Sequence, residues 1–520
     1  MIDPAPADPA PGHHLAGWHE RKKRLLMLLL PAIAGVEFLE SGMFVFAASH
    51  IAGGVDAAPR EFAQVLAAYA IGSMMMIAMQ QWLARHFGYR RYLAAAFALF
   101  VAGAVASALA EGLQALTLAR LVEGFGGGAL FTSSRILVML LFAPAERPRA
   151  LRHFIVVLFG LSALGPALSG WLVESWGWRW VFAAPVPLMA LAAAGAWMLL
   201  PDAVGRSGEP VRWAAGPLLL FAAAITLVQL GLSEARYDVF LNPLHLIALA
   251  LAGLLLLGWF AAHQWGHDEP LLRLRELRHP AYLLGLGFYF MHYCMSNASS
   301  YVFPILAERG LGMPLSTVGL LNSFAAAVTW AAAFAYVRFG SKLPAKRPLM
   351  AAGAAALALS AWLLASQPPD VNVATLLPAL AAKGVFGALF VLPVAGLTFR
   401  ELGEERFAPG YQGKNLMRQL AGSFGTSLAA IALTDLQFSA HTQLAGGMEH
   451  TVSAGWIAAL EAGFAARGFS PGEAHAAALA EVARLIGQQT LLLACDEFYR
   501  LLAVLAALVL VAVLAQRRFR

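Results

Sequence analysis

Residues 25–49 read LLMLLLPAIAGVEFLESGMFVFAAS, an apolar run that carries only two charged side chains, Glu37 and Glu40. A hydrocarbon core about 30 Å thick requires roughly 20 apolar residues of helix, so this run is long enough to cross a bilayer. The preceding basic segment, Arg21–Arg24, is typical of a signal peptide, but the run is too long and lacks a small-residue cleavage site followed by a soluble domain. We therefore predict an uncleaved first transmembrane helix.

Runs of similar length recur as far as residue 516 in a chain that is 60% hydrophobic and only 13% charged. Backbone polar groups in lipid must be bonded within their own segment, so these runs should be helices. The period-two alternation of a membrane β-barrel is absent. The sequence predicts an all-α membrane protein with fourteen transmembrane helices. The predicted spans are 25–49, 61–84, 91–110, 114–141, 149–174, 178–200, 211–233, 240–264, 279–307, 315–337, 348–366, 372–399, 410–435 and 491–516.

Lys and Arg residues gather in alternate connecting segments. Of the 36 basic residues, 25 lie in segments on one side, including both chain ends, the turn 85–91 and a segment that carries Lys414. The positive-inside rule places this side, and both termini, in the cytoplasm. The net charge of +6 is thus spread over many short loops, and we predict no nucleic-acid partner. Two cysteines, Cys294 and Cys495, predict neither a disulfide framework nor a metal site.

Two short basic turns indicate an internal repeat, at residues 82–91 and 336–347. If the seventh and eighth spans are an insertion, each turn joins the second and third helices of a six-helix half, as in many secondary transporters. The alternative is a chance similarity between two cytoplasmic turns. The predicted divisions are a disordered cytoplasmic tail at 1–20, a six-helix bundle at 21–200, two inserted helices at 201–270, and a second bundle at 271–520 with an outside loop, containing short helices, at 436–490.

Five motifs follow one another along the chain. They are Leu39-Glu40-Ser41-Gly42, Trp82-Leu-Ala-Arg85 with Gly88, Arg120-Leu-Val-Glu123-Gly124, Gly160 followed by Gly165-Pro166-Ala-Leu-Ser169-Gly170, and Asn415-Leu-Met-Arg418. In this pattern the chain resembles the major facilitator superfamily, and within it the fourteen-span drug:proton antiporters of the EmrB/QacA type, nearest the EmrB branch. Three positions depart from that family's usual residues: Glu40 replaces Asp, Glu123 replaces Gln and Ser169 replaces Gly.

This resemblance implies a major facilitator fold of two six-helix bundles plus two additional helices, in a bacterial inner membrane. It implies an antiporter motif that seals against proton leak, formed by Gly160, Gly165, Pro166 and Gly170. It also implies a cytoplasmic gating turn, formed by Arg85, Gly88, Arg90 and Arg91. A proton gradient would supply the energy without a cofactor or metal. In the EmrB branch, the partners implied are a periplasmic adaptor and an outer-membrane channel.

Charged residues inside spans are costly and are functional candidates by default. At 1.5 Å per residue, Glu40 and Glu123 each lie about 14 Å from the outer ends of their spans, and Arg120 lies one turn further out. These three residues can therefore share one level, and we predict that they couple transport to protons as a linked set. The alternative is a static Arg120–Glu123 pair that only neutralises itself.

Other polar residues inside spans are candidates for substrate binding. Glu37 lies on roughly the same helix face as Glu40. Lys383 and Arg418 lie near the midplane of the second half, where two cations facing a cavity would favour an anionic ligand; alternatively, they pair internally with a carboxylate such as Glu37. His292 and Asn297 could line the cavity or simply be satisfied by a neighbouring helix.

The sequence therefore predicts a proton-coupled antiporter that exports small amphipathic or drug-like compounds. The alternative is a dedicated exporter of an endogenous metabolite, lipid or siderophore on the same fold. An enzyme or sensor is disfavoured, because the chain has no zinc-binding His pair and no nucleophile elbow.

Overall fold

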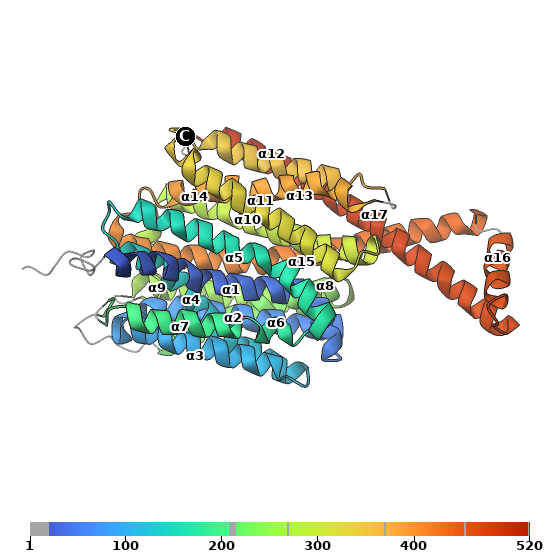
Figure 1. The fold of residues 1–520 in the computed structure, drawn as a ribbon, viewed down its shortest axis with the longest axis horizontal. Coiled ribbons are helices and arrows are strands. Elements are labelled where there is room, and N and C mark those ends of the chain that lie inside the picture. Colours follow the sequence, from blue (N-terminus) through green and yellow to red (C-terminus); the bar gives the residue numbers. More distant parts are fainter. Residues whose placement is uncertain are drawn as a thin grey trace, which may run out of the picture.

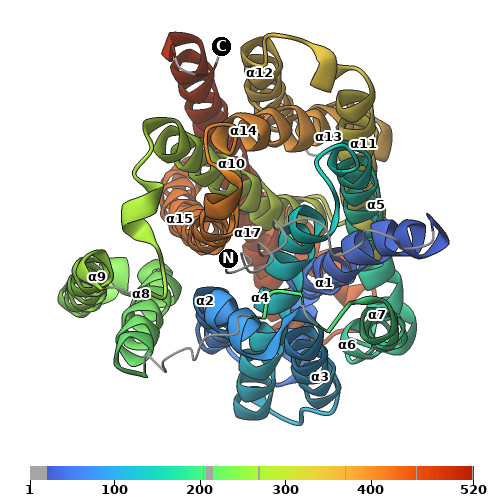
Figure 2. The same ribbon diagram turned by 90° about the vertical axis from the view of Figure 1, so that its left-hand side faces the viewer.

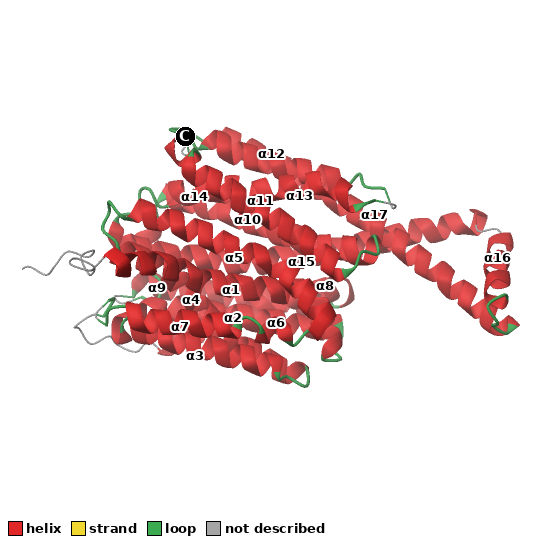
Figure 3. Cartoon of the chain, viewed as in Figure 1, coloured by secondary structure: helices red, strands yellow, loops and turns green. Residues whose placement is uncertain are grey.

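The computed structural model describes residues 20–202, 204–206, 215–267, 270–368, 371–451, 454–517 and 519. Across these residues the regular elements are helices and no strand occurs (Figure 3). The prediction of an all-helical protein is therefore confirmed. The predicted tail at 1–20 lies outside the described residues, apart from Glu20, which begins the first helix.

The helices follow one another with short connections. Those of the first part of the chain are α1 (Glu20–Gly54), α2 (Pro59–Phe87), α3 (Tyr89–Ala108), α4 (Leu113–Leu141), α5 (Arg147–Trp176), α6 (Trp180–Ala183), α7 (Val186–Leu199), α8 (Ala215–Leu241) and α9 (Pro243–Gly266). Those of the second part are η1 (Leu274–Leu277), α10 (Pro280–Pro304), η2 (Ile305–Gly310), α11 (Leu315–Arg338), η3 (Gly340–Lys342), α12 (Arg347–Leu364), α13 (Val373–Leu389), α14 (Val391–Thr398), α15 (Glu404–Thr451), α16 (Ala454–Ala465) and α17 (Pro471–Ala515).

Among the described residues, twelve helical segments are long and apolar enough to cross a bilayer. Helices α10 and α15 run through the bundle beside these twelve segments, but their sequences are not apolar enough to be counted with them. Polar side chains interrupt their apolar sequence, among them His292 and Asn297 in α10 and Lys414 and Arg418 in α15. The predicted number of fourteen spans is therefore not confirmed. The sixth predicted span is divided into α6 and α7 at Pro185, which cannot donate a backbone hydrogen bond.

The helices form two groups that meet along α5 and α11. In the first group α4 packs against α2 and α3, and α1 packs against α5; in the second, α10 packs against α15, and α12 packs against α13 and α17. Helix α8 contacts both α2 and α15, while α9 packs on α8 at the edge of the molecule (Figure 2). The division into bundles at 21–200 and 271–520, with the two inserted helices of 201–270 outside them, stays a prediction.

Helices α15 and α17 continue beyond the bundle and are joined there by α16 (Figure 1). The prediction of a loop that begins at residue 436 is therefore wrong, because α15 remains helical to Thr451; residues 426–445 contain neither Gly nor Pro to break it. Helix α17 begins with a capping box, in which Glu473 accepts bonds from the amide and hydroxyl of Ser470 at 2.9 and 2.7 Å. The end of the bundle that carries α16 is called the α16 side, and the end where α1 begins is the opposite side.

Apolar and charged side chains are distributed as expected for a protein in lipid. Leu255 on α9 is 72% exposed, and other large apolar residues on the outer helices are similarly exposed. Glu40, Arg120 and Glu123 are instead no more than 1% exposed. Charges that face the bundle interior avoid contact with hydrocarbon, and buried charges of this kind are candidates for function.

Candidate functional site

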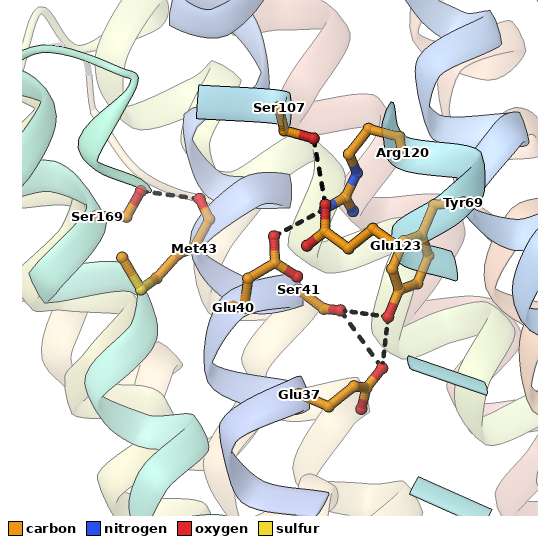
Figure 4. Close-up of polar contacts among 9 residues, drawn as sticks. All are labelled: Glu37, Glu40, Ser41, Met43, Tyr69, Ser107, Arg120, Glu123 and Ser169. Atoms are coloured by element: carbon orange, nitrogen blue, oxygen red, sulfur yellow. Dashed lines mark hydrogen bonds and ion pairs between the residues drawn. The ribbon is translucent and has the colours of Figure 1, made fainter. Parts of the chain in front are cut away.

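A cluster of two acids and one arginine lies inside the first group of helices, as Figure 4 shows. Arg120 Nη1 on α4 lies 2.7 Å from Glu40 Oε1 on α1 and 2.9 Å from Glu123 Oε2, one turn along α4. The Ser107 hydroxyl on α3 donates to Glu123 Oε2 at 3.3 Å. The structure thus brings together Glu40, Arg120 and Glu123, which we call the acid–arginine cluster.

Close helix packing holds this cluster in place. Gly103 on α3 faces Glu123 so closely that a Cβ added there would lie 2.5 Å from the Glu123 Cβ. The guanidinium of Arg120 lies over the rings of Phe44 and Tyr69, at 3.9 and 4.3 Å from their centroids. Such cation–π contacts contribute about 0.5–2 kcal/mol each. The arginine is therefore held by two aromatic rings and by two carboxylates at its end.

Glu37 lies one turn before Glu40 on α1 and forms a second polar layer (Figure 4). Its Oε1 accepts a hydrogen bond from the Tyr69 hydroxyl at 2.8 Å and one from the Ser41 hydroxyl at 3.4 Å. Tyr69 therefore links the two layers, because its ring contacts Arg120 and its hydroxyl contacts Glu37.

The charge balance of the acid–arginine cluster permits proton exchange. Two ionised carboxylates beside one guanidinium leave one excess negative charge, which a single proton would neutralise. One oxygen of each acid, Glu40 Oε2 and Glu123 Oε1, is buried without a hydrogen-bond partner. A proton could therefore bind at either oxygen without displacing Arg120.

A cavity of about 530 Å³ lies between the two helix groups. Its walls include Glu37, Arg120, Asn297 and Arg418, so three of the five predicted substrate-binding residues border it. The lining residues of α1 and α10 come from the halves of these helices that are nearer the α16 side. The cavity therefore occupies that part of the bundle.

The other two predicted substrate-binding residues lie elsewhere. His292 is buried among aromatic rings, with its ring 4.8 Å from that of Phe386, and is absent from the cavity lining. Lys383 Nζ lies 5.7 Å from the ring centroid of Phe303 and is also absent from the lining. These positions give no support to direct substrate contact by either residue in this conformation.

Polar contacts join the two helix groups between the cavity and the opposite side. The side-chain amide of Gln412 donates to two backbone oxygens of α2 at 2.6 and 2.8 Å, and that of Asn415 donates to Thr132 Oγ1 at 3.0 Å. Near the start of α15, Arg147 forms a bidentate contact with Glu404 at 2.5 and 3.1 Å. The hydrogen bonds from Arg147 lower the pKa of the Glu404 carboxyl. These contacts, made by Gln412, Asn415, Thr132, Arg147 and Glu404, form the inter-group seal.

Lys414 is a functional candidate that sequence reasoning placed in a cytoplasmic segment. The structure corrects this position, because Lys414 is 4% exposed inside α15, and its Nζ lies 5.0–5.6 Å from the ring centroids of Tyr411, Tyr289, Phe131 and Tyr293. The spacing of Lys414 and Arg418, four residues apart on one helix face, was the signal that could have revealed it.

Arg135, Lys414 and Arg418 together form what we call the basic column. The Arg418 guanidinium lies 4.4 Å from the Phe131 ring centroid, and that of Arg135 lies 5.1 Å from the Phe407 centroid. Aromatic contacts of this kind contribute about 0.5–2 kcal/mol, whereas removing a charge from water costs several kcal/mol. The rings therefore offset only part of the cost of burying these cations.

The predicted antiporter motif lies where α5 passes between α1 and α11. A Cβ at Gly165 would lie 3.2 Å from the Leu39 backbone oxygen, and one at Gly170 would lie 3.0 Å from that of Leu315. A Cβ at Gly160 would lie 3.3 Å from the indole nitrogen of a tryptophan on α11. These glycines permit close approach of the neighbouring helices.

Pro166 and Ser169 add polar contacts to this crossing. After Pro166, the amide of Ala167 donates to Ser323 Oγ on α11 at 2.9 Å, so a neighbouring helix satisfies the backbone there. The Ser169 hydroxyl, at the position where the resembling family usually has Gly, donates to the Met43 backbone oxygen at 2.8 Å (Figure 4). The motif therefore connects both helix groups at one crossing.

The predicted gating turn lies between α2 and α3 on the opposite side. Gly88 has a positive φ of 77°, which favours glycine, and Arg90 Nη1 lies 2.7 Å from Asp202 Oδ1 just after α7. Arg85 and Arg91 are exposed. The contact of Arg90 lies within the first helix group, and the gating role of the turn stays a prediction.

The residues that the structure describes contain no cluster of metal-ligating side chains. No group of three or more His, Cys, Asp or Glu side chains is arranged there to hold an ion. Cys294 and Cys495 are both buried and free.

Comparison with known proteins places these features in context. Residues 32–426 match the family model described as Major Facilitator Superfamily. The chain is 23% identical over 412 residues to the fatty acid resistance protein FarB of Neisseria gonorrhoeae, covering 79% of this chain and 80% of FarB. It is 24% identical over 431 residues to the multidrug export protein EmrB of Haemophilus influenzae, covering 81% and 82%.

Solved structures share the fold at low sequence identity. A structure from work on proton dependent oligopeptide transporters has a TM-score of 0.60 at 12% identity, covering 94% of this chain and 98% of that chain. A bacterial homolog of the human lysosomal transporter Spinster, in an inward-facing and unoccupied conformation, has a TM-score of 0.59 at 16% identity, covering 96% and 98%. At such identities the likeness concerns the fold alone.

Proposed function

The chain belongs to the Major Facilitator Superfamily of membrane transporters, as its motifs predicted, and on this premise we propose that it is a proton-driven antiporter that exports small amphipathic compounds. The observation that carries the proposal is the acid–arginine cluster. Glu40, Arg120 and Glu123 are fully buried, and Arg120 Nη1 lies within 2.9 Å of a carboxylate oxygen of each acid. The cluster therefore contains two acids and one base. A structural ion pair needs no second carboxylate, whereas a proton-exchanging site gains from one.

The transport cycle follows from this charge balance. A proton taken up on the α16 side neutralises one carboxylate, weakens its attraction to Arg120 and favours rearrangement of α1 against α4. The inter-group seal then opens, and the proton leaves on the opposite side, where substrate enters. A ligand or proton can drive such a change only through a difference in its affinity for the two states.

The cavity supplies the substrate site of this proposal. It combines polar side chains from both helix groups, including Glu37, Asn297 and Arg418, with apolar walls. Such a lining suits amphipathic molecules. The names of the relatives FarB and EmrB, which refer to fatty acid resistance and multidrug export, support export as the direction. A dedicated exporter of one endogenous metabolite, lipid or siderophore is the alternative on the same fold.

The orientation and partners belong to the same proposal. The basic segments on the opposite side favour a cytoplasmic location for that side and for both termini, in a bacterial inner membrane. The projection formed by α15, α16 and α17 would then lie in the periplasm. It is the part of the molecule available to a periplasmic adaptor that leads to an outer-membrane channel.

Proteoliposomes that contain the purified chain test this proposal. With an acidic lumen and a neutral exterior, proton efflux should drive accumulation of amphipathic compounds from a panel, and a potassium–proton exchanging ionophore should abolish it. Protein-free liposomes serve as the control for passive partitioning. Accumulation that depends on a sodium gradient, or that persists after the pH gradient collapses, would contradict proton antiport.

A further inference from the structure

The basic column lies between the cavity and the opposite side. Arg418 borders the cavity, and Lys414 precedes it by one turn of α15, about 6 Å along the helix. Phe131 joins these two levels, because its ring lies 4.4 Å from the Arg418 guanidinium and 5.4 Å from Lys414 Nζ. Arg135 lies one turn beyond Phe131 on α4. The column therefore runs from the cavity floor into the region of the inter-group seal.

The polar atoms of the basic column lack the partners that burial demands. Arg418 Nε and Nη2 and Arg135 Nη1 are buried without a hydrogen-bond partner. The hydrogen bond of Lys414 Nζ goes to Oδ1 of the adjacent Asn415, at 3.2 Å. Among the described residues no acid forms an ion pair with any of the three, and Glu37 acts on Arg418 only at longer range. Buried charges without an opposite charge are rare, so an anionic ligand is the expected complement.

Aromatic rings surround the basic column and define the rest of the ligand. Phe131, Tyr289, Tyr293 and Tyr411 enclose Lys414, with Tyr289 and Tyr293 stacked at 5.9 Å between centroids. Stacked rings beside a cation suit a flat or extended apolar body attached to a negative group. Gln412 and Asn415 lie on the adjacent stripe of α15 and close the seal there, so opening of the seal would expose the column.

We propose that Arg135, Lys414 and Arg418 form a binding subsite for the negative group of amphipathic organic anions, such as carboxylates or sulfonates with an apolar or aromatic body. This inference rests on the proposed transport function and specifies its substrate class. The anion meets Lys414 and Arg135 when the seal is open and passes to Arg418 at the cavity floor. The acid–arginine cluster, on the other side of Tyr69, remains free to exchange protons.

Two probes that differ in one group test this subsite in the wild-type protein. Anilinonaphthalene sulfonate and N-phenylnaphthylamine share an aromatic skeleton, and only the first carries a negative charge. Their binding to the full chain in nanodiscs is measured by energy transfer from tryptophan, with empty nanodiscs subtracted. The sulfonate should bind at least about tenfold more tightly than the neutral probe, the factor expected for one charge-assisted hydrogen bond. Equal affinities would overturn the proposal.

Substitutions in the basic column assign that preference to its residues. Lys414→Met and Arg418→Gln should each weaken sulfonate binding by about tenfold and leave binding of the neutral probe unchanged. Lys414→Arg should retain sulfonate binding, because it keeps the charge. Lys342→Met, which removes an exposed lysine, is the matched control. Retained binding of the neutral probe also reports that each variant is folded.

The outcomes separate this inference from the proposed function. If both variants bind the sulfonate as the wild type does, or lose both probes equally, the subsite is refuted. Proton-driven export of neutral compounds could still hold in that case, because the binding experiment requires no pH gradient. If the sulfonate binds as expected but no compound accumulates in acidic proteoliposomes, the proton-antiport proposal fails and the anion subsite remains.

Discussion

Replacing Arg120 with methionine should destabilise the folded protein, because it removes the cation that contacts both Glu40 and Glu123. Methionine retains an unbranched apolar stem, so the packing between Phe44 and Tyr69 changes little. The main effect is that two carboxylates, no more than 1% exposed, lose their counter-ion. Their remaining hydrogen bond among the described side chains is the one from Ser107 to Glu123.

The expected magnitude follows from this geometry. Breaking a buried ion pair by removing one partner typically costs about 3–5 kcal/mol, because the other charge is left uncompensated. The contacts at 2.7 and 2.9 Å are both lost, and the loss of two cation–π contacts adds about 1–4 kcal/mol. We therefore expect Arg120→Met to lower the free energy of unfolding by about 4–9 kcal/mol.

Equilibrium unfolding in mixed micelles of dodecyl sulfate and dodecyl maltoside measures this loss. The double variant Arg120→Met with Glu40→Gln should recover about 1–3 kcal/mol relative to the sum of the single effects, because the residues are in direct contact. A loss below about 1 kcal/mol, or strict additivity in the double variant, would refute the view that Arg120 compensates these acids.

Two further predictions concern the α16 side. In intact cells, a membrane-impermeant maleimide should label Ser470→Cys but label Lys342→Cys only after permeabilisation, and the reverse pattern would contradict the proposed orientation. Near the end of α8, His245 Nδ1 lies 2.9 Å from Asp238 Oδ2, and Arg60 Nη2 lies 2.8 Å from Asp238 Oδ1. The hydrogen bond from His245 and the charge of Arg60 lower the pKa of Asp238. The stability of the wild type, measured by thermal unfolding, should therefore fall as pH drops through this lowered pKa, whereas Asp238→Asn should begin less stable and depend less on pH.

Much of the acid–arginine cluster could be predicted from sequence, because helix geometry makes depth calculable. Residues 120 and 123 lie one turn apart on any helix, and counting along the first and fourth spans placed Glu40 at the same level. The counting could not show which side chains complete the site. Tyr69 and Ser107 are ordinary residues in apolar helices, and their roles depend on how α2 and α3 rotate against α4.

The side-chain environments of the second half were harder to predict, although the spans 279–307 and 410–435 that carry its polar residues were themselves predicted. Lys414 was counted with the basic residues of a cytoplasmic segment, although it lies inside the predicted span 410–435. Helix α15 instead begins at Glu404, so Lys414 lies three turns inside it and faces aromatic rings. Lys383 was placed near the midplane and His292 inside a span, but span position could not tell which helix face borders the cavity, and neither residue does.

Gradient-driven transport by Glu40→Gln tests the central claim most directly. Glutamine mimics a permanently protonated carboxyl group, so the variant should still exchange labelled for unlabelled substrate across proteoliposome membranes at equal pH. It should fail to accumulate substrate when a pH gradient is imposed. Glu123→Gln is the matched comparison, and its defect should be milder, because Gln is the usual residue there in the resembling antiporters. Accumulation by Glu40→Gln at the wild-type rate would contradict the account and remove Glu40 from the coupling site.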